Sequence, residues 1–131
     1  MGLRSMITLE TVYNWLNSKE DEHVEFKEAK NQIHSVDVFE YCVALANEGG
    51  GHLVLGISPI IPRKPVGSRA LMDTTEWKLK LYNELKLRIE IQELIVEGKR
   101  IVVLSIPPGP PERRFITKAS IFSESVNRLC L

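Results

Sequence analysis

Hydrophobic and polar residues follow two different periods along the chain, and these periods divide it into helices and strands. Residues 7–16 place apolar side chains at spacings of three and four, which predicts a short amphipathic helix with Thr8 as a candidate cap. Residues 23–28 instead alternate apolar and polar one by one. This pattern predicts a short strand with one solvated face.

Two longer helices are expected further along. Residues 36–47 are apolar on nearly every side, so we expect a buried helix that Ser35 caps and that the glycines at 49–51 end. Asp73 opens an Asp-Thr-Thr-Glu capping box for the second helix. Its expected buried stripe consists of Trp77, Leu81, Leu85 and Ile89.

The remaining apolar runs predict strands. Residues 52–58 lie between glycines and Pro59, which is typical of a central strand. Residues 91–96 and 100–106 flank a Glu97-Gly98 turn and predict a hairpin, and residues 115–122 are expected to form a last strand. We find no repeat and no linker. Residues 1–131 are therefore expected to form a single mixed α/β domain, with about four to five strands, two main helices and the short N-terminal helix.

Composition favours a cytoplasmic protein without a membrane segment. The 131 residues are 44% hydrophobic and 26% charged, and no apolar run approaches the roughly 20 residues that span a bilayer. The two cysteines, Cys42 and Cys130, do not form a disulfide framework. Because 17 basic residues balance 17 acidic ones, any affinity for nucleic acid must come from local clustering of cations.

A basic, proline-rich loop is the first candidate for such clustering. Residues 59–69 contain three prolines together with Arg63, Lys64 and Arg69, a composition that suits phosphate contacts. A solvated loop without a ligand is the alternative, and the loop alone does not decide between them.

The glycine-rich turn after the first long helix is the second candidate. Asn47, Gly49 and Gly50 lie where backbone N–H groups can approach a phosphate, although a simple helix stop explains the glycines equally. The turn follows a helix and precedes a strand, which is the reverse of a P-loop. An ATPase or helicase activity is therefore not expected.

Charged side chains around the first strand are the third candidate. Glu20, Glu25 and Glu28 could gather round a divalent metal, Mg²⁺ or Mn²⁺, for phosphodiester cleavage, while Lys27 and Lys30 add positive charge. Spacing alone favours a solvated strand face with weak ion pairs. If the chain is a binding module and not a nuclease, no cofactor is expected.

Four segments occur together in order: HVEFKEAK, YCVALANEGGG, HLVLGIS and PRKPVGS. This combination resembles the DNA-binding domain shared by Schlafen proteins and RecG-like transcriptional regulators, over roughly residues 8–110. The resemblance implies an Alba-like fold that binds DNA. Many relatives carry a C-terminal winged helix, for which this chain has no room, so we expect a stand-alone domain or a fragment. Residues 111–131 depart from the family pattern.

The resemblance also implies a nuclease as the alternative function. Schlafen-type ribonucleases use three carboxylates; Glu20 and Glu25 match two of them, but no acid stands near Ser58, where the third belongs. We therefore expect a non-catalytic nucleic-acid-binding module, with contacts from Lys27, Lys30, Arg63, Lys64, Arg69, Asn47, Gly49 and Gly50. A protein-interaction role or a homodimer through exposed strand edges is a further alternative.

Overall fold

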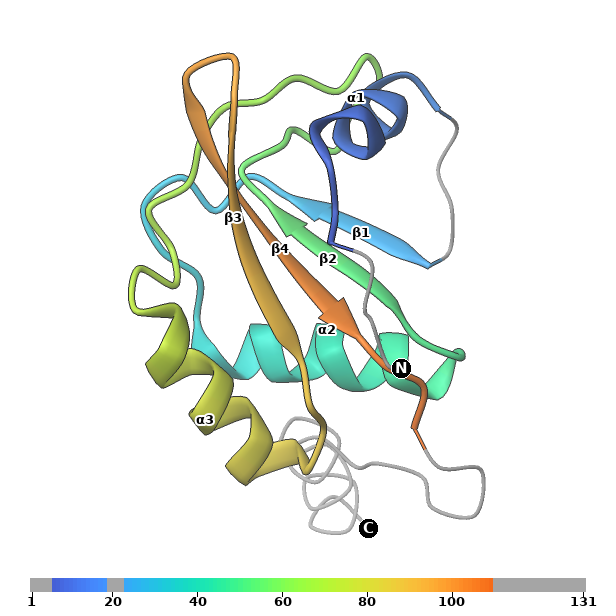
Figure 1. Ribbon diagram of the computed structural model, residues 1–131, viewed down its shortest axis with the longest axis vertical. Coiled ribbons are helices and arrows are strands. Elements are labelled where there is room, and N and C mark those ends of the chain that lie inside the picture. Colours follow the sequence, from blue (N-terminus) through green and yellow to red (C-terminus); the bar gives the residue numbers. More distant parts are fainter. Residues whose placement is uncertain (1–5, 19–22, 110–131) are drawn as a thin grey trace, which may run out of the picture.

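The computed structural model describes residues 6–18 and 23–109, and this part of the chain folds into a mixed sheet with helices on both faces (Figure 1). The helices are α1 (Leu9–Asn17), α2 (Ser35–Asn47) and α3 (Thr74–Leu85). The strands are β1 (Val24–Lys27), β2 (Gly51–Leu55), β3 (Glu90–Val96) and β4 (Lys99–Ile106). The α/β architecture predicted from the hydrophobic pattern is confirmed.

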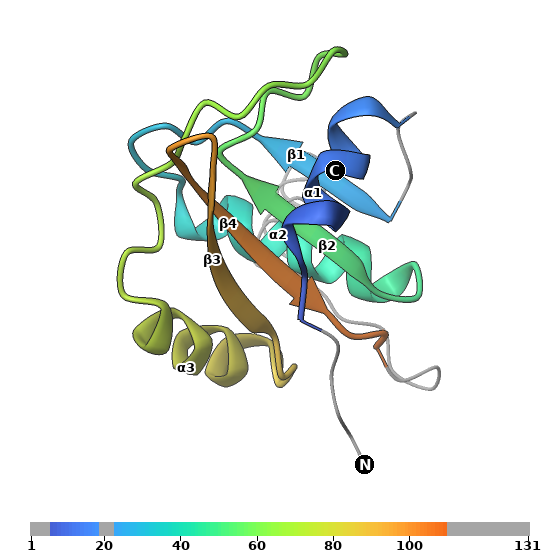
Figure 2. The same ribbon diagram turned by 45° about the horizontal axis from the view of Figure 1, so that its top comes forward.

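The sheet has the strand order β1-β2-β4-β3 (Figure 2). β1 and β2 are parallel and α2 connects them, as a parallel pair requires. β4 pairs antiparallel with both β2 and β3. β2 therefore lies inside the sheet, as predicted, and β1, β2 and β3 all end at the edge where the hairpin turn between β3 and β4 lies.

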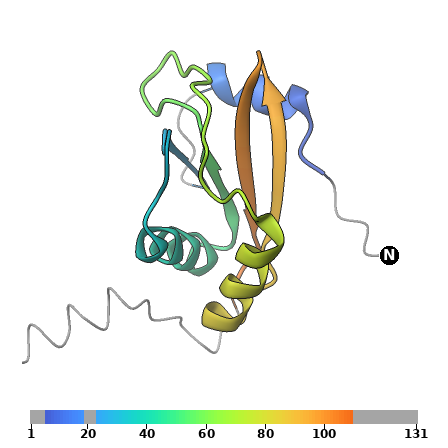
Figure 3. The same ribbon diagram turned by 90° about the vertical axis from the view of Figure 1, so that its left-hand side faces the viewer.

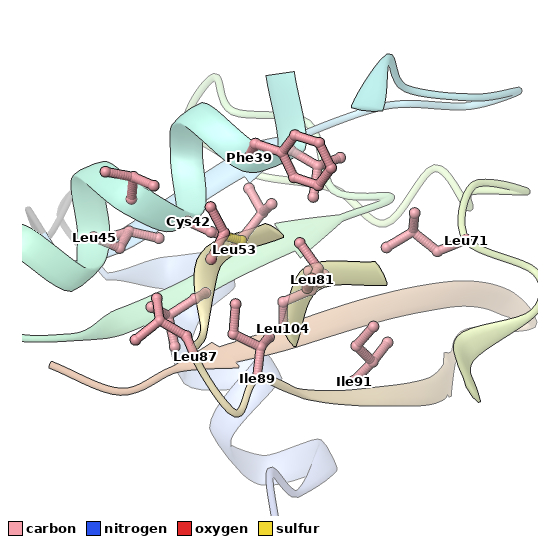
Figure 4. Close-up of a cluster of buried hydrophobic side chains, with 14 of the residues drawn as sticks. Phe39, Cys42, Leu45, Leu53, Leu71, Leu81, Leu87, Ile89, Ile91 and Leu104 are labelled. Carbon is pink, nitrogen blue, oxygen red and sulfur yellow. The ribbon is translucent and has the colours of Figure 1, made fainter. Parts of the chain in front are cut away.

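Both faces of the sheet are covered (Figures 1 and 3). Leu53, Leu55 and Leu104 pack against α2 and α3, in the cluster that Figure 4 shows. Val54 and Val103 point the other way and pack with Val12 of α1. This two-sided burial explains why the central strands are apolar at successive positions.

Cys42 lies within the α2 side of this core and is fully buried. Burial disfavours the thiolate and raises the pKa of its thiol to about 12. The side chain is therefore a neutral packing group at physiological pH.

Two of the predicted helix caps are confirmed and one is wrong. The Thr8 hydroxyl accepts from the N–H of Thr11, and the Asp73 carboxylate accepts from the N–H of Glu76. Ser35 does not cap α2, because it is the first residue of the helix itself. The first hydrogen-bonded turn begins one residue earlier, where the His34 carbonyl accepts from the N–H of Val38 at 3.2 Å.

The ends of two elements also differ from the prediction. α3 ends at Leu85, because Lys86 takes a left-handed conformation with a φ of 57°. Ile89 is buried, as expected, but from the extended segment that leads into β3. β2 ends at Leu55 rather than at residue 58, and Gly56 follows it with a φ of 101°. The strand predicted over residues 115–122 lies outside the described residues.

Within residues 6–18 and 23–109, each helix is too short or too polar to cross a bilayer.

Candidate nucleic-acid interface

A cleft of about 500 Å³ lies at the edge of the sheet where β1, β2 and β3 end. Three segments that are far apart in the sequence form it: the turn after β1, the long loop between β2 and α3, and the hairpin between β3 and β4 (Figure 1). We call it the basic cleft. Its lining residues are Lys30, Asn31, Val66, Gly67, Ser68, Arg69, Gly98, Lys99 and Arg100.

Positive charge dominates the basic cleft. Each of the three segments contributes an exposed cation, Lys30, Arg69 and Lys99 respectively. Arg100 is a fourth cation in the lining, although it is paired with Glu93, and none of the described lining residues is acidic. A chain of zero net charge thus concentrates cations in one concave surface, which attracts polyanions.

Hydrogen bonds of the backbone and of the Ser68 hydroxyl fix the three segments to one another. The Arg69 N–H donates to the Lys30 carbonyl at 2.9 Å, and the Ser68 hydroxyl donates to the Ala29 carbonyl at 2.6 Å. The N–H of Ser68 donates to the Arg100 carbonyl at 2.8 Å. Because these bonds tie the cation-bearing segments together, little ordering remains to be done when a ligand binds.

Gly67 lies beside the hairpin with a φ of 87°, a conformation that favours glycine. A side chain at this position would begin 3.5 Å from the Cβ of Lys99 and 3.6 Å from its Cδ. The stem of Lys99 therefore runs along the loop that carries Arg69. The sequence interpretation missed Lys99, and its only signal was a cation directly after the Glu97-Gly98 turn.

Two of the predicted contact residues, Lys30 and Arg69, line the basic cleft, and Lys27 does not. Lys27 forms an ion pair with Glu25 at 3.4 Å, and its ammonium lies 4.8 Å from the centre of the Tyr41 ring. A hydrogen bond with Tyr41 raises the pKa of Lys27, so its charge is stabilised. Lys27 thus lies on the α2 side of β1, paired with Glu25 and apart from the cleft.

Arg63 occupies an interior position that does not suit the predicted phosphate contact. It is only 4% exposed, and its Nη1 donates to the carbonyls of Trp15 and Ser18 at 2.8 and 2.7 Å. Its guanidinium also stacks 4.3 Å from the centre of the Phe26 ring. Its neighbour Lys64 is exposed but does not line the cleft.

The glycine-rich turn lies at the other end of β2, away from the basic cleft. The N–H of Gly49 donates to Ala46 at 3.2 Å and that of Gly50 donates to Leu45 at 2.8 Å. These two N–H groups bind carbonyls in the last turn of α2. They are therefore not free for the phosphate contact that the sequence predicts at this turn. Asn47 is exposed at the same end of the helix.

The carboxylates of the nuclease alternative are only partly placed. Glu25 is partly exposed on β1 and pairs with Lys27, whereas Glu20 lies outside the described residues. Among the residues that the structure describes, no three His, Cys, Asp or Glu side chains gather where they could hold a metal ion.

The described chain is thus an α/β domain with a basic cleft at one edge of its mixed sheet. It belongs to the Schlafen AlbA_2 family, whose sequence pattern matches residues 20–128. The family relationship inferred from the four sequence segments is confirmed.

Two solved structures have a similar fold. The N-terminal domain of a RecG-related protein from Nitrosomonas europaea is 27% identical, with a TM-score of 0.54, over 79% of this chain and 74% of that one. A Corynebacterium diphtheriae protein is 15% identical, with a TM-score of 0.60 over 88% of this chain, and it shares the fold. The chain spans only 21% of that protein's length. No curated protein matches the chain in sequence.

Proposed function

We propose that the chain is a non-catalytic module that binds nucleic acid, and DNA in particular, by holding backbone phosphates in the basic cleft. The observation that carries the proposal is the convergence of Lys30, Arg69 and Lys99 from three separate segments onto one cleft without an acidic neighbour in its described lining. Membership of a nucleic-acid-associated family supports the same proposal. Such a module suits a transcriptional regulator, the role that the resemblance implies.

The chemistry of the cleft favours phosphates over bases. Four of its nine described lining residues are cations, which bind phosphates of any sequence, and Asn31 is the one side-chain amide among them that could read adenine by paired hydrogen bonds. Contacts of this kind position a duplex without reading its sequence. We therefore expect weak sequence preference and strong salt dependence.

Titration of a fluorescently labelled duplex of about 20 base pairs, between about 50 and 200 mM salt, tests the proposal. Each of Lys30→Ala, Arg69→Ala and Lys99→Ala should weaken binding of unrelated sequences equally and lower the slope of log K against log salt by about 0.9. Arg88→Ala is the matched control, because Arg88 is exposed at the opposite end of β3 from the hairpin turn.

Absence of binding at about 50 mM salt, or a triple variant that binds as the wild type does, would show that the proposal is wrong. A duplex RNA of the same sequence distinguishes the two nucleic acids: we expect the DNA to bind more tightly. Tighter binding of the RNA would leave the basic cleft as the binding site but show that RNA, and not DNA, is the preferred ligand.

A further inference from the structure

All three nitrogens of the Arg100 guanidinium bind groups inside the protein. Its Nε donates to Glu93 Oε2 at 2.7 Å, and Nη1 donates to the carbonyls of Ser68 at 3.1 Å and Ala70 at 2.7 Å. Its Nη2 donates to the Leu71 carbonyl at 3.0 Å and contacts the same Glu93 oxygen at 2.7 Å. Four of the five N–H groups of the guanidinium therefore make hydrogen bonds inside the protein, and Nη2 also lies within ion-pair distance of Glu93.

The carbonyls that Arg100 binds lie on both sides of Arg69. Nη1 bridges Ser68 and Ala70, so it holds the peptide group immediately before Arg69, the residue that presents its cation to the basic cleft, and the peptide group that follows Ala70. The Arg69 N–H in turn donates to the carbonyl of Lys30. The Arg100 side chain thus helps to fix the loop that carries Arg69, and the backbone of that loop is bonded to the segment that carries Lys30.

Glu93 completes the arrangement and balances its charge. The Arg100 side chain is 16% exposed and its carboxylate partner on β3 is 47% exposed, so the pair lies at the surface margin of the core. Because the carboxylate compensates the guanidinium, Arg100 contributes little free charge to the cleft that it lines.

We propose that Arg100 is a positioning residue, which holds Arg69 and through it Lys30 in the geometry that a backbone phosphate needs, and which does not itself contact the phosphate. This inference rests on the proposed function. It predicts that the shape of the guanidinium matters for binding and not only its charge, because the three donors of a lysine ammonium cannot reproduce five contacts in a planar fork.

A double-mutant cycle on the full chain tests the inference, with the same labelled duplex. Arg100→Lys keeps the charge, yet it should weaken binding about tenfold, within the range of coupling seen in one hydrogen-bond network. In an Arg69→Ala background the same change should cost distinctly less than tenfold, because the Arg69 cation is gone and only the effect on Lys30 through the backbone remains. Arg88→Lys is the matched control. It should leave the affinity for duplex unchanged both in the wild type and in the Arg69→Ala background.

Glu93→Ala provides a second measurement, which also serves if the Arg100→Lys variant does not fold. A positioning role and a purely electrostatic role of Arg100 predict opposite changes in the affinity of this variant for duplex. Removal of an acid near a polyanion should tighten binding if only charge matters. If Arg100 positions the loop, loss of its carboxylate partner should instead weaken binding about threefold.

The outcomes separate this inference from the function on which it rests. If the wild type does not bind duplex at all, both proposals are wrong. If the wild type binds and Arg69→Ala weakens it, the positioning role alone is wrong when the Arg100→Lys loss is the same in both backgrounds, or when Glu93→Ala tightens binding.

Discussion

The guanidinium of Arg63 donates a 2.8 Å hydrogen bond to the carbonyl of Trp15, 48 residues earlier in the chain. Trp15 lies in the last turn of α1, where helix carbonyls have no partner within the helix, and Arg63 also donates to Ser18 just beyond. A cation at a helix C-terminus is favoured by the helix dipole as well. Arg63 therefore fastens the long loop to α1 across the edge of the sheet.

Replacement of Arg63 by alanine should destabilise the fold rather than act on the basic cleft. It removes two charge-assisted hydrogen bonds and the stacking on Phe26, so we expect a loss of about 3 kcal/mol in the free energy of unfolding. Urea denaturation measures it. Lys64→Ala, at an exposed neighbouring position, is the control and should change stability by less than about 0.5 kcal/mol. Equal stability of the two variants would contradict the structural role.

The fold was predictable from local patterns because each element follows a simple period. Residues 23–28 alternate one by one and contain β1 at residues 24–27, and the turn at Glu97-Gly98 joins two apolar runs as a hairpin. Boundaries were less accurate, as at Ser35 and Ile89, because they depend on the conformation of single residues such as Lys86. Such conformations leave little trace in the pattern of apolar positions.

The basic cleft was only half predictable, because burial is a property of the tertiary structure. Arg63 and Arg69 are chemically identical and belong to the same loop, yet one is buried beneath α1 and the other is exposed at the cleft. Lys99 was overlooked because its segment joins the others only in the folded sheet. The sequence places Arg100 as an ordinary strand residue, because its partners at Ser68 and Ala70 come near it only in the folded chain.

Gly49 and Gly50 provide a matched test of why the turn after α2 needs glycine. Their φ angles are nearly the same, 98° and 96°, but a Cβ at Gly49 would meet open space, whereas one at Gly50 would lie 2.8 Å from the Ile106 carbonyl oxygen. Gly49→Ala should therefore cost about 1–2 kcal/mol of stability, from backbone strain alone. Gly50→Ala should cost distinctly more, because backbone atoms must also move.

Thermal or urea unfolding of the two glycine variants measures the difference. Because both N–H groups bond within the protein, neither change should lower the salt slope of DNA binding, in contrast to Arg69→Ala. A reduced salt slope of DNA binding in Gly49→Ala would instead support the phosphate contact that the sequence predicts at this turn. Equal destabilisation by both changes would show that close packing against Ile106 is unimportant.

His52 should make the stability of the fold depend on pH. It lies on the α1 side of β2, with its ring centre 5.3 Å from that of Trp15, and burial lowers its pKa below the ordinary value of 6.5. The unfolded chain then takes up a proton at a higher pH than the folded one, so stability is full above about pH 6.5 and falls as the pH decreases through the lowered pKa.

Urea denaturation at about pH 8 and about pH 5 tests this dependence. The free energy of unfolding should fall more between these two pH values for the wild type than for His52→Gln. The other two histidines, His23 and His34, are present in both proteins and cancel in the comparison. Identical pH dependence of the two proteins would mean that His52 titrates alike in the folded and unfolded chains.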